Sequence, residues 1–334
     1  MMPYRAHQFG KRICKQLKIA RGMMHFDTHN LSGTVLLAGS GRSGTTWMSQ
    51  IINHGNPYRD IFEPFHPRHV GQVRGWPAMR YVPVESDDDA LAQLIAGQLA
   101  GRIRSRWTDA YNRKHIASRR LIKAIRTNLM LGFIRRRFSE VKLLFAMRHP
   151  CAVVHSRVKL GWDTHLDQLL AQPALMRDHL DPHHEAIERI EHSGETWHKH
   201  LAMWCIENLV PMRELRTGDA HLLRYEDLCR DFDREVSALF AFLGRAVPGD
   251  IHDTARQRSA HFRRDSAILR GGDLISDWQR HVETRHIDMM LDTLAAFGLG
   301  HLYDESPTPR CDRDAVFMDS SLPRQTNSIH KDAA

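Results

Sequence analysis

The chain has 334 residues, 42% of them hydrophobic and 26% charged, and a formal net charge of +8 at pH 7. This length is enough for one large folded domain with its own core, and the positive charge implies an anionic partner without identifying it. No apolar stretch approaches the ~20 residues that cross a bilayer, so no transmembrane segment is predicted and peripheral membrane contact is left open.

Residues 1–32 form a basic lead-in that lacks the apolar core of a signal peptide. Five cysteines are scattered along the chain with no Cys-x-x-Cys spacing, which indicates free thiols in a reducing compartment. We therefore expect a cytoplasmic protein. The sequence does not predict its oligomeric state.

A strand is predicted over Thr34–Ala38, followed by a turn with three glycines and a helix from Thr45 to about Asn53. Glycines allow backbone N–H groups to approach a ligand, and the start of a helix adds partial positive charge. The segment Ser43–Thr46, with two threonine hydroxyls, therefore predicts a phosphate cradle.

The cradle differs from the P-loop of nucleotide hydrolases and kinases. In that motif a lysine follows the last glycine, whereas here Thr45 follows Gly44 and the cation is Arg42. The strand-like run 141–147 is followed by Arg148 and has no aspartate to hold a magnesium-bound water. These residues predict a phosphate site without the apparatus for a metal-bound triphosphate.

Three further strands are predicted over Leu121–Ile125, Lys142–Met147 and His221–Tyr225, each followed by a helical pattern. Such alternation is typical of an α/β fold in which helices flank a parallel sheet, whose ligands bind beyond the carboxyl ends of the strands. We therefore expect the glycine turn, Lys123, Arg148 and Tyr225 at one rim.

A single domain is predicted over residues 33–303. Residues 87–106 are expected to form a surface helix, and a polar, histidine-rich insertion at about 160–200 is expected to form a solvated cap over the rim. Residues 304–334 contain few apolar side chains and are expected to be disordered. The 23 histidines lack a His-Glu-x-x-His motif, so no metal site is predicted.

Four segments, in chain order, resemble those of sulfotransferases that use 3′-phosphoadenosine 5′-phosphosulfate (PAPS). Residues 40–47 resemble the loop for the 5′-phosphosulfate, and residues 148–156 the segment for the 3′-phosphate. Residues 223–228 are similar to a tyrosine-containing segment near the adenine, and residues 270–278 to a late loop. The resemblance implies a P-loop-like sulfotransferase fold and metal-free transfer of a sulfuryl group from PAPS to an acceptor.

The resemblance also implies roles for individual residues. The expected contacts of the 5′-phosphosulfate are Arg42, Ser43, Gly44, Thr45 and Thr46; those of the 3′-phosphate are Arg148, Ser156, Arg270 and Gly271; and those of the adenine are Trp47 and Tyr225. Gly271 stands where lysine is common in the family, so Arg270 is the better candidate of that pair. Lys123 is expected to stabilise the sulfonate.

The catalytic base distinguishes two branches of the family. In the small-molecule branch a histidine lies two residues after the lysine, but here that position is Ile125, which cannot accept a proton. The segment 61–65 instead resembles the Phe-Glu-Pro segment of carbohydrate sulfotransferases, which implies Glu63 as the base, with apolar neighbours raising its pKa. His66 and His69 are nearby candidates for the acceptor site.

The favoured interpretation is a PAPS-dependent enzyme with a glycan or glycolipid acceptor and no nucleic-acid partner. One alternative is a nucleotide kinase or NTPase with a degenerate loop, which requires magnesium-dependent ATP turnover. Another is a non-catalytic basic module that binds nucleic acid or another polyanion, which would show salt-sensitive binding without nucleotide selectivity.

Overall fold

The protein is represented by a computed structural model that describes residues 16–17, 20–256 and 274–317. Five parallel strands form the central sheet in the order β3-β5-β2-β6-β7. Their bounds are Arg59–Phe62 (β3), Arg120–Ala124 (β5), Thr34–Gly39 (β2), Lys142–Met147 (β6) and Ala220–Arg224 (β7). The predicted parallel α/β fold is confirmed, and the four predicted strands agree within one residue at each end. The edge strand β3 was not predicted.

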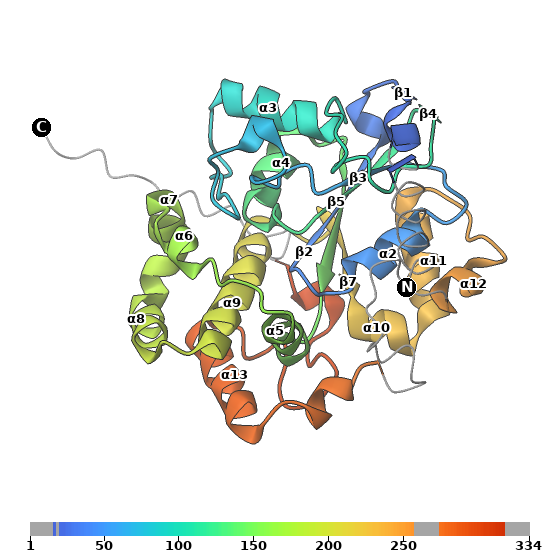
Figure 1. Ribbon diagram of the computed structural model, residues 1–334. Coiled ribbons are helices and arrows are strands. Elements are labelled where there is room, and N and C mark those ends of the chain that lie inside the picture. The colour runs from blue at the N-terminus through green and yellow to red at the C-terminus, as the bar shows by residue number, and fades with distance from the viewer. Residues whose placement is uncertain (1–15, 18–19, 257–273, 318–334) are drawn as a thin grey trace, which may run out of the picture.

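Helices cover both faces of this sheet (Figure 1). Leu36 and Ala38 of β2 face a core that includes residues of α4 (Leu131–Arg137) and α9 (Thr196–Glu214). Val35 and Leu37 alternate with them and face α2 (Thr45–Ile52) and α11 (Phe232–Leu243). Burial of both faces explains why the central strands are continuous apolar runs.

The remaining α-helices lie around these two layers. Their bounds are Asp89–Leu99 (α3), Pro150–Lys159 (α5), Leu166–Leu170 (α6), Pro173–Leu175 (α7), His184–Ser193 (α8), Tyr225–Arg230 (α10), Ile251–Arg256 (α12) and Thr284–Ala296 (α13). The helix expected over 87–106 is therefore shorter. Asp88 caps its start by accepting a hydrogen bond from the Leu91 amide, and Gly101 follows its end with φ of +65°.

The predicted cap contains α6, α7, α8 and the start of α9, and its histidines are only partly solvated: His184 and His192 are exposed. His179, His183 and His200 are all buried. The His179 ring lies within hydrogen-bonding distance of Glu214, and the His183 ring stacks on Phe297. Local composition predicted exposure, whereas packing against other helices buries these rings.

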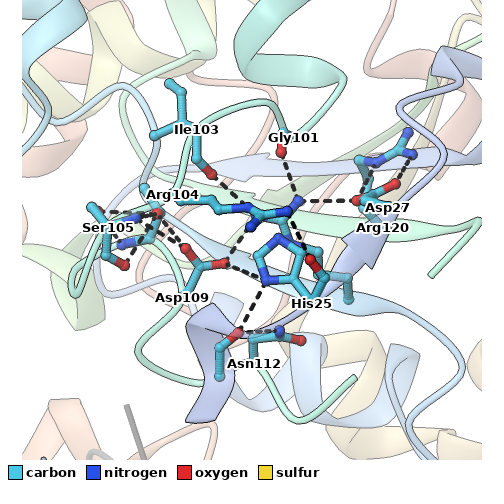
Figure 2. Close-up of polar contacts among 12 residues, drawn as sticks. His25, Asp27, Gly101, Ile103, Arg104, Ser105, Asp109, Asn112 and Arg120 are labelled. Atoms are coloured by element: carbon cyan, nitrogen blue, oxygen red, sulfur yellow. Dashed lines mark hydrogen bonds and ion pairs between the residues drawn. The ribbon is translucent and has the colours of Figure 1, made fainter. Parts of the chain in front are cut away.

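Buried ion pairs connect the amino ends of the strands to the segment around β1 (Phe26–Asp27), which pairs with β4 (Ile116–Ala117) (Figure 2). Arg59 Nη1 lies 3.0 Å from Asp27 Oδ2, and Arg59 Nη2 lies 2.9 Å from Asp109 Oδ1. Arg120 Nη2 lies 2.5 Å from Asp27 Oδ1. Part of the predicted N-terminal lead-in is thus an integral component of the domain.

The predicted disorder after Tyr303 is wrong for the described residues 304–317. Val316 and Phe317 are buried, and the Phe317 ring lies 6.2 Å from the Phe145 ring of β6. These two apolar side chains stabilise a segment whose overall composition is polar. In the described ranges, no helix combines the length and apolar character needed to span a membrane.

Candidate active site

The carboxyl ends of all five strands of the central sheet contribute to one rim. Gly39 ends β2, Glu63 follows β3, Lys123 lies next to the end of β5, Arg148 follows β6 and Tyr225 follows β7. The convergence expected from strand direction is confirmed. The unpredicted strand β3 explains why Glu63 lies at the same rim.

The glycine turn between β2 and α2 depends on close backbone approaches. A Cβ at Gly39 would lie 2.4 Å from the Ala146 carbonyl oxygen, and one at Gly44 would lie 2.5 Å from Cδ2 of Tyr225. Both glycines have positive φ, as does Arg42 at +82°. The Ser43 hydroxyl oxygen is buried and has no hydrogen-bond partner among the described residues. The turn therefore presents an unsatisfied polar group where α2 begins.

Two arginines next to this turn have no acidic partner among the residues that the structure describes. Arg42 Nε donates to Ser156 Oγ at 2.9 Å, and Arg148 Nη1 donates to the Arg42 carbonyl oxygen at 3.3 Å. Neither arginine forms an ion pair within the part of the chain that the structure describes. Desolvation and the charges of Arg148 and Arg157 lower the pKa of the Arg42 guanidinium. This arrangement brings Arg42, Arg148 and Ser156 together beside the glycine turn.

Glu63 is buried and has a positive φ of 45°. Lys123 Nζ lies 2.9 Å from Oε1, Arg126 Nη1 lies 3.4 Å from Oε2, and the Ile125 amide donates to Oε2 at 3.2 Å. The carboxylate is therefore contacted by two cations and an amide, and not by apolar neighbours alone as expected. Arg126 was missed in the sequence because its partner lies 63 residues away.

An aromatic cluster lies on the other side of Glu63. Trp107 Nε1 donates to the Glu63 carbonyl oxygen at 3.2 Å, and the His69 ring stacks on Trp107 at 3.7 Å. Burial and then the charge of Arg126 lower the pKa of His66 to about 3. His66 is thus a neutral imidazole at neutral pH.

A cavity of about 270 Å³ connects the rim to the cap. Its lining includes Gly41 of the glycine turn, Arg126, and Trp162 and His200 of the cap. Arg157, a second residue that sequence analysis missed, also lines it. The cap thus lies where it can contact a molecule bound next to the glycine turn.

The two predicted adenine contacts are mostly buried below the turn. Trp47 and Tyr225 are 6% and 5% exposed, and their ring centroids lie 5.7 Å apart. Arg148 stacks 4.1 Å from the Tyr225 centroid. Trp278, from the late loop, stacks on His149 at 4.3 Å. Arg270 and Gly271 lie outside the described residues.

The described ranges contain no group of three histidine, cysteine, aspartate or glutamate side chains arranged to hold an ion.

The family model described as "Sulfotransferase domain" matches residues 32–284. Three solved structures are similar. A sulfotransferase domain from the curacin biosynthetic pathway has 14% identity and a TM-score of 0.42, and the match covers 79% of this chain and 97% of that one. A sulfotransferase domain from the Synechococcus PCC 7002 olefin synthase has 17% identity and a TM-score of 0.42, with 84% and 96% covered, and mouse sulfotransferase SULT7A1 complexed with PAP has 14% identity and a TM-score of 0.41, with 85% and 91% covered.

No curated protein gives a significant match. Because the family model covers well over half of the chain, and the glycine turn and the rim lie within that match, the protein belongs to the sulfotransferase domain family.

Proposed function

We propose that this sulfotransferase moves a sulfuryl group from PAPS to an acceptor hydroxyl and releases adenosine 3′,5′-bisphosphate. The observation that carries the proposal is a pair of cations beside a glycine turn, Arg42 and Arg148, which have no acidic partner within residues 20–256 and 274–317. A nucleotide with phosphate groups at both ends of its ribose offers two anions, and each arginine can neutralise one.

The residues present fit such a co-substrate. The unpartnered Ser43 hydroxyl and the amides at the start of α2 are donors suited to the 5′-phosphosulfate. Arg148 follows β6, and Ser156 lies on α5, which begins at Pro150. Only a ligand group lying along this helix can contact both, and the 3′-phosphate suits that position.

The reaction forms a bond from the acceptor oxygen to sulfur and breaks the bond from sulfur to the 5′-phosphate oxygen. PAPS supplies the sulfuryl group and a phosphate leaving group. Arg42 is placed to stabilise the charge that develops on that leaving group. Glu63 accepts the acceptor's proton, and Lys123, 2.9 Å from its carboxylate, can also contact a sulfonate oxygen.

The acceptor is proposed to be a glycan or glycolipid that enters the cavity between the rim and the cap. Supporting features are the Phe62-Glu63-Pro64 segment and the polar lining from Arg126, Asp163 and His165. Trp162 is 37% exposed at this wall, and its ring can stack on the apolar face of a sugar. A hydroxyl-rich acceptor with an apolar face would complement both kinds of side chain.

Calorimetry with adenosine 3′,5′-bisphosphate and with Mg²⁺-ADP tests the nucleotide assignment. We expect the bisphosphate to bind at least about tenfold more tightly, since ADP lacks the 3′-phosphate that Arg148 and Ser156 would contact. Equal affinities would refute the assignment. A screen of glycans and glycolipids with radiolabelled PAPS then tests the acceptor class, and labelling confined to other acceptors would reject it.

Glu63→Gln tests the base. Loss of a general base should lower kcat by about 10²-fold or more, while the affinity for the bisphosphate changes little. A matched control is Glu188→Gln, since Glu188 is an exposed residue on α8 that faces His184. An unchanged kcat for Glu63→Gln would show that the base is elsewhere.

A further inference from the structure

Arg157 is a buried cation directly below the glycine turn, and it is 2% exposed. Its Nε donates to the Gly41 carbonyl oxygen at 3.2 Å, and its Nη2 lies 2.7 Å from Glu207 Oε2. Glu207, on α9, is also 2% exposed. The guanidinium therefore bridges the turn and the long helix, with its charge neutralised by the carboxylate.

Two asparagines connect the preceding residues of the turn to the same helix. Asn208 Nδ2 donates to Ser40 Oγ at 3.3 Å. Asn128 Oδ1 accepts from the Gly39 amide at 3.0 Å, while its Nδ2 donates to the Glu207 carbonyl oxygen at 2.9 Å. Gly39, Ser40 and Gly41 are thus each held by a polar side chain connected to α9. Asn208 belongs to this helix, whereas Asn128 and Arg157 both contact its residue Glu207.

The next residue, Arg42, has a φ of +82°, a conformation that is unfavourable for any residue other than glycine. Such a conformation persists only where the surrounding structure determines it. Arg157 fixes the carbonyl just before Arg42, and Arg148 donates to the carbonyl of Arg42 itself. Arg157 and Arg148 therefore fix the peptide groups on the two sides of Arg42, the residue with the strained φ.

We propose that Arg157, oriented by Glu207, is a positioning residue for the 5′-phosphosulfate loop. It fixes the peptide between Gly41 and Arg42, so that the following N–H groups and the Arg42 side chain face the 5′-phosphate. This inference rests on the proposed function. Arg157 differs from Arg42 and Arg148 because a carboxylate pairs with its guanidinium, and the proposed role is to fix the position of the loop.

The test compares how strongly each variant uses the 5′-phosphate. The measured quantity is the ratio of the dissociation constants of adenosine 3′-phosphate and adenosine 3′,5′-bisphosphate, determined by calorimetry. Arg157→Lys keeps the positive charge but lacks the planar fork that reaches Gly41 and Glu207 together. We expect the ratio to fall about tenfold, the effect of losing roughly one charge-assisted hydrogen bond.

A matched control exists at the opposite end of the sheet. Arg59 is also a buried fork that joins two carboxylates and the carbonyl oxygens of Gly101 and Ile103. Arg59→Lys should lower the urea midpoint of unfolding as Arg157→Lys does, but leave the ratio at the wild-type value. A general loss of stability would lower the ratio of dissociation constants equally in both variants, whereas a positioning role lowers this ratio only in Arg157→Lys.

The outcomes distinguish the proposed function from the positioning role of Arg157. If the wild-type protein binds both nucleotides equally, the proposed function is wrong. If the wild type prefers the bisphosphate and Arg157→Lys retains its ratio, or Arg59→Lys loses as much, the positioning role is wrong. Should Arg157→Lys fail to fold, Glu207→Gln removes only the charge that orients the guanidinium. A fall in its ratio supports the role, and a wild-type ratio refutes it.

Discussion

Replacing Gly44 with alanine would place a Cβ atom where the Tyr225 ring already lies. That Cβ would be 2.5 Å from Cδ2 and 2.9 Å from Cε2 of the ring. The ring is confined by the Arg148 guanidinium, 4.1 Å from its centroid, and by Trp47, 5.7 Å away. A left-handed φ costs a non-glycine residue about 1–2 kcal/mol, and overpacking a buried site costs about 1–3 kcal/mol more. We therefore expect the free energy of unfolding to fall by about 2–5 kcal/mol.

Urea denaturation of two variants separates these contributions. Gly55 has a similar φ of +73°, but a Cβ there would meet nothing within 4 Å. Gly55→Ala should therefore lose only the conformational contribution of about 1–2 kcal/mol and keep its affinity for the bisphosphate. Gly44→Ala should lose more stability and bind the bisphosphate more weakly, because the ring supports the turn. Equal destabilisation of the two variants would refute the close contact with Tyr225.

Two further predictions concern the fold around the site. Burial raises the pKa of Glu226, which accepts hydrogen bonds from the His149 amide and the Tyr303 hydroxyl, from 4.5 to about 7. Protonated Glu226 thus stabilises the fold below pH 4.5, and this contribution is lost as the pH rises through 7. Between pH 5 and pH 8, the free energy of unfolding of Glu226→Gln, measured by urea denaturation, should therefore rise by up to about 3 kcal/mol relative to that of the wild type. A difference that does not change with pH would contradict the raised pKa. Phe317→Ala should lower the free energy of unfolding by about 3 kcal/mol, because it removes a buried ring near Phe145, and an unchanged urea midpoint would show that this segment is not packed on the core.

The glycine turn was predictable because its signals are local. An apolar run, three glycines and a helix start follow one another within Thr34–Ile52, so no distant contact is needed to recognise them. Strand β3 was missed for the opposite reason. Its first residues, Arg59 and Asp60, are charged, and Arg59 is buried only because Asp27 and Asp109 lie next to it in the fold.

The surroundings of Glu63 depend in the same way on residues distant in the sequence. Lys123 and Arg126 lie 60 and 63 residues further along the chain, and the sequence does not show that both point to one carboxylate. The strand pattern predicts that Lys123 lies at the rim, but it does not predict that Lys123 forms an ion pair with Glu63. The Arg157–Glu207 pair, 50 residues apart, was missed for the same reason.

The charges at the two ends of the central sheet are arranged differently. At the amino end, Arg59 and Arg120 are each neutralised by a buried aspartate. Burying an arginine without such a partner would be strongly destabilising, so the charges of Arg59 and Arg120 serve the fold and are not available to a ligand. A net charge of +8 therefore does not by itself locate an anion site.

At the carboxyl end, paired and unpaired cations lie side by side. Arg157 and Lys123 contact carboxylates, whereas Arg42 and Arg148 have none among the described residues. The paired cations fix the positions of Gly41 and Glu63, and the unpaired cations are left to neutralise a ligand. Negative charge bound at this rim would relieve the repulsion between the guanidinium groups of Arg42 and Arg148. A ligand with two phosphate groups can offer one anion to each of them, so the proposed co-substrate suits the local arrangement of charge and does not rest on the net charge of the chain.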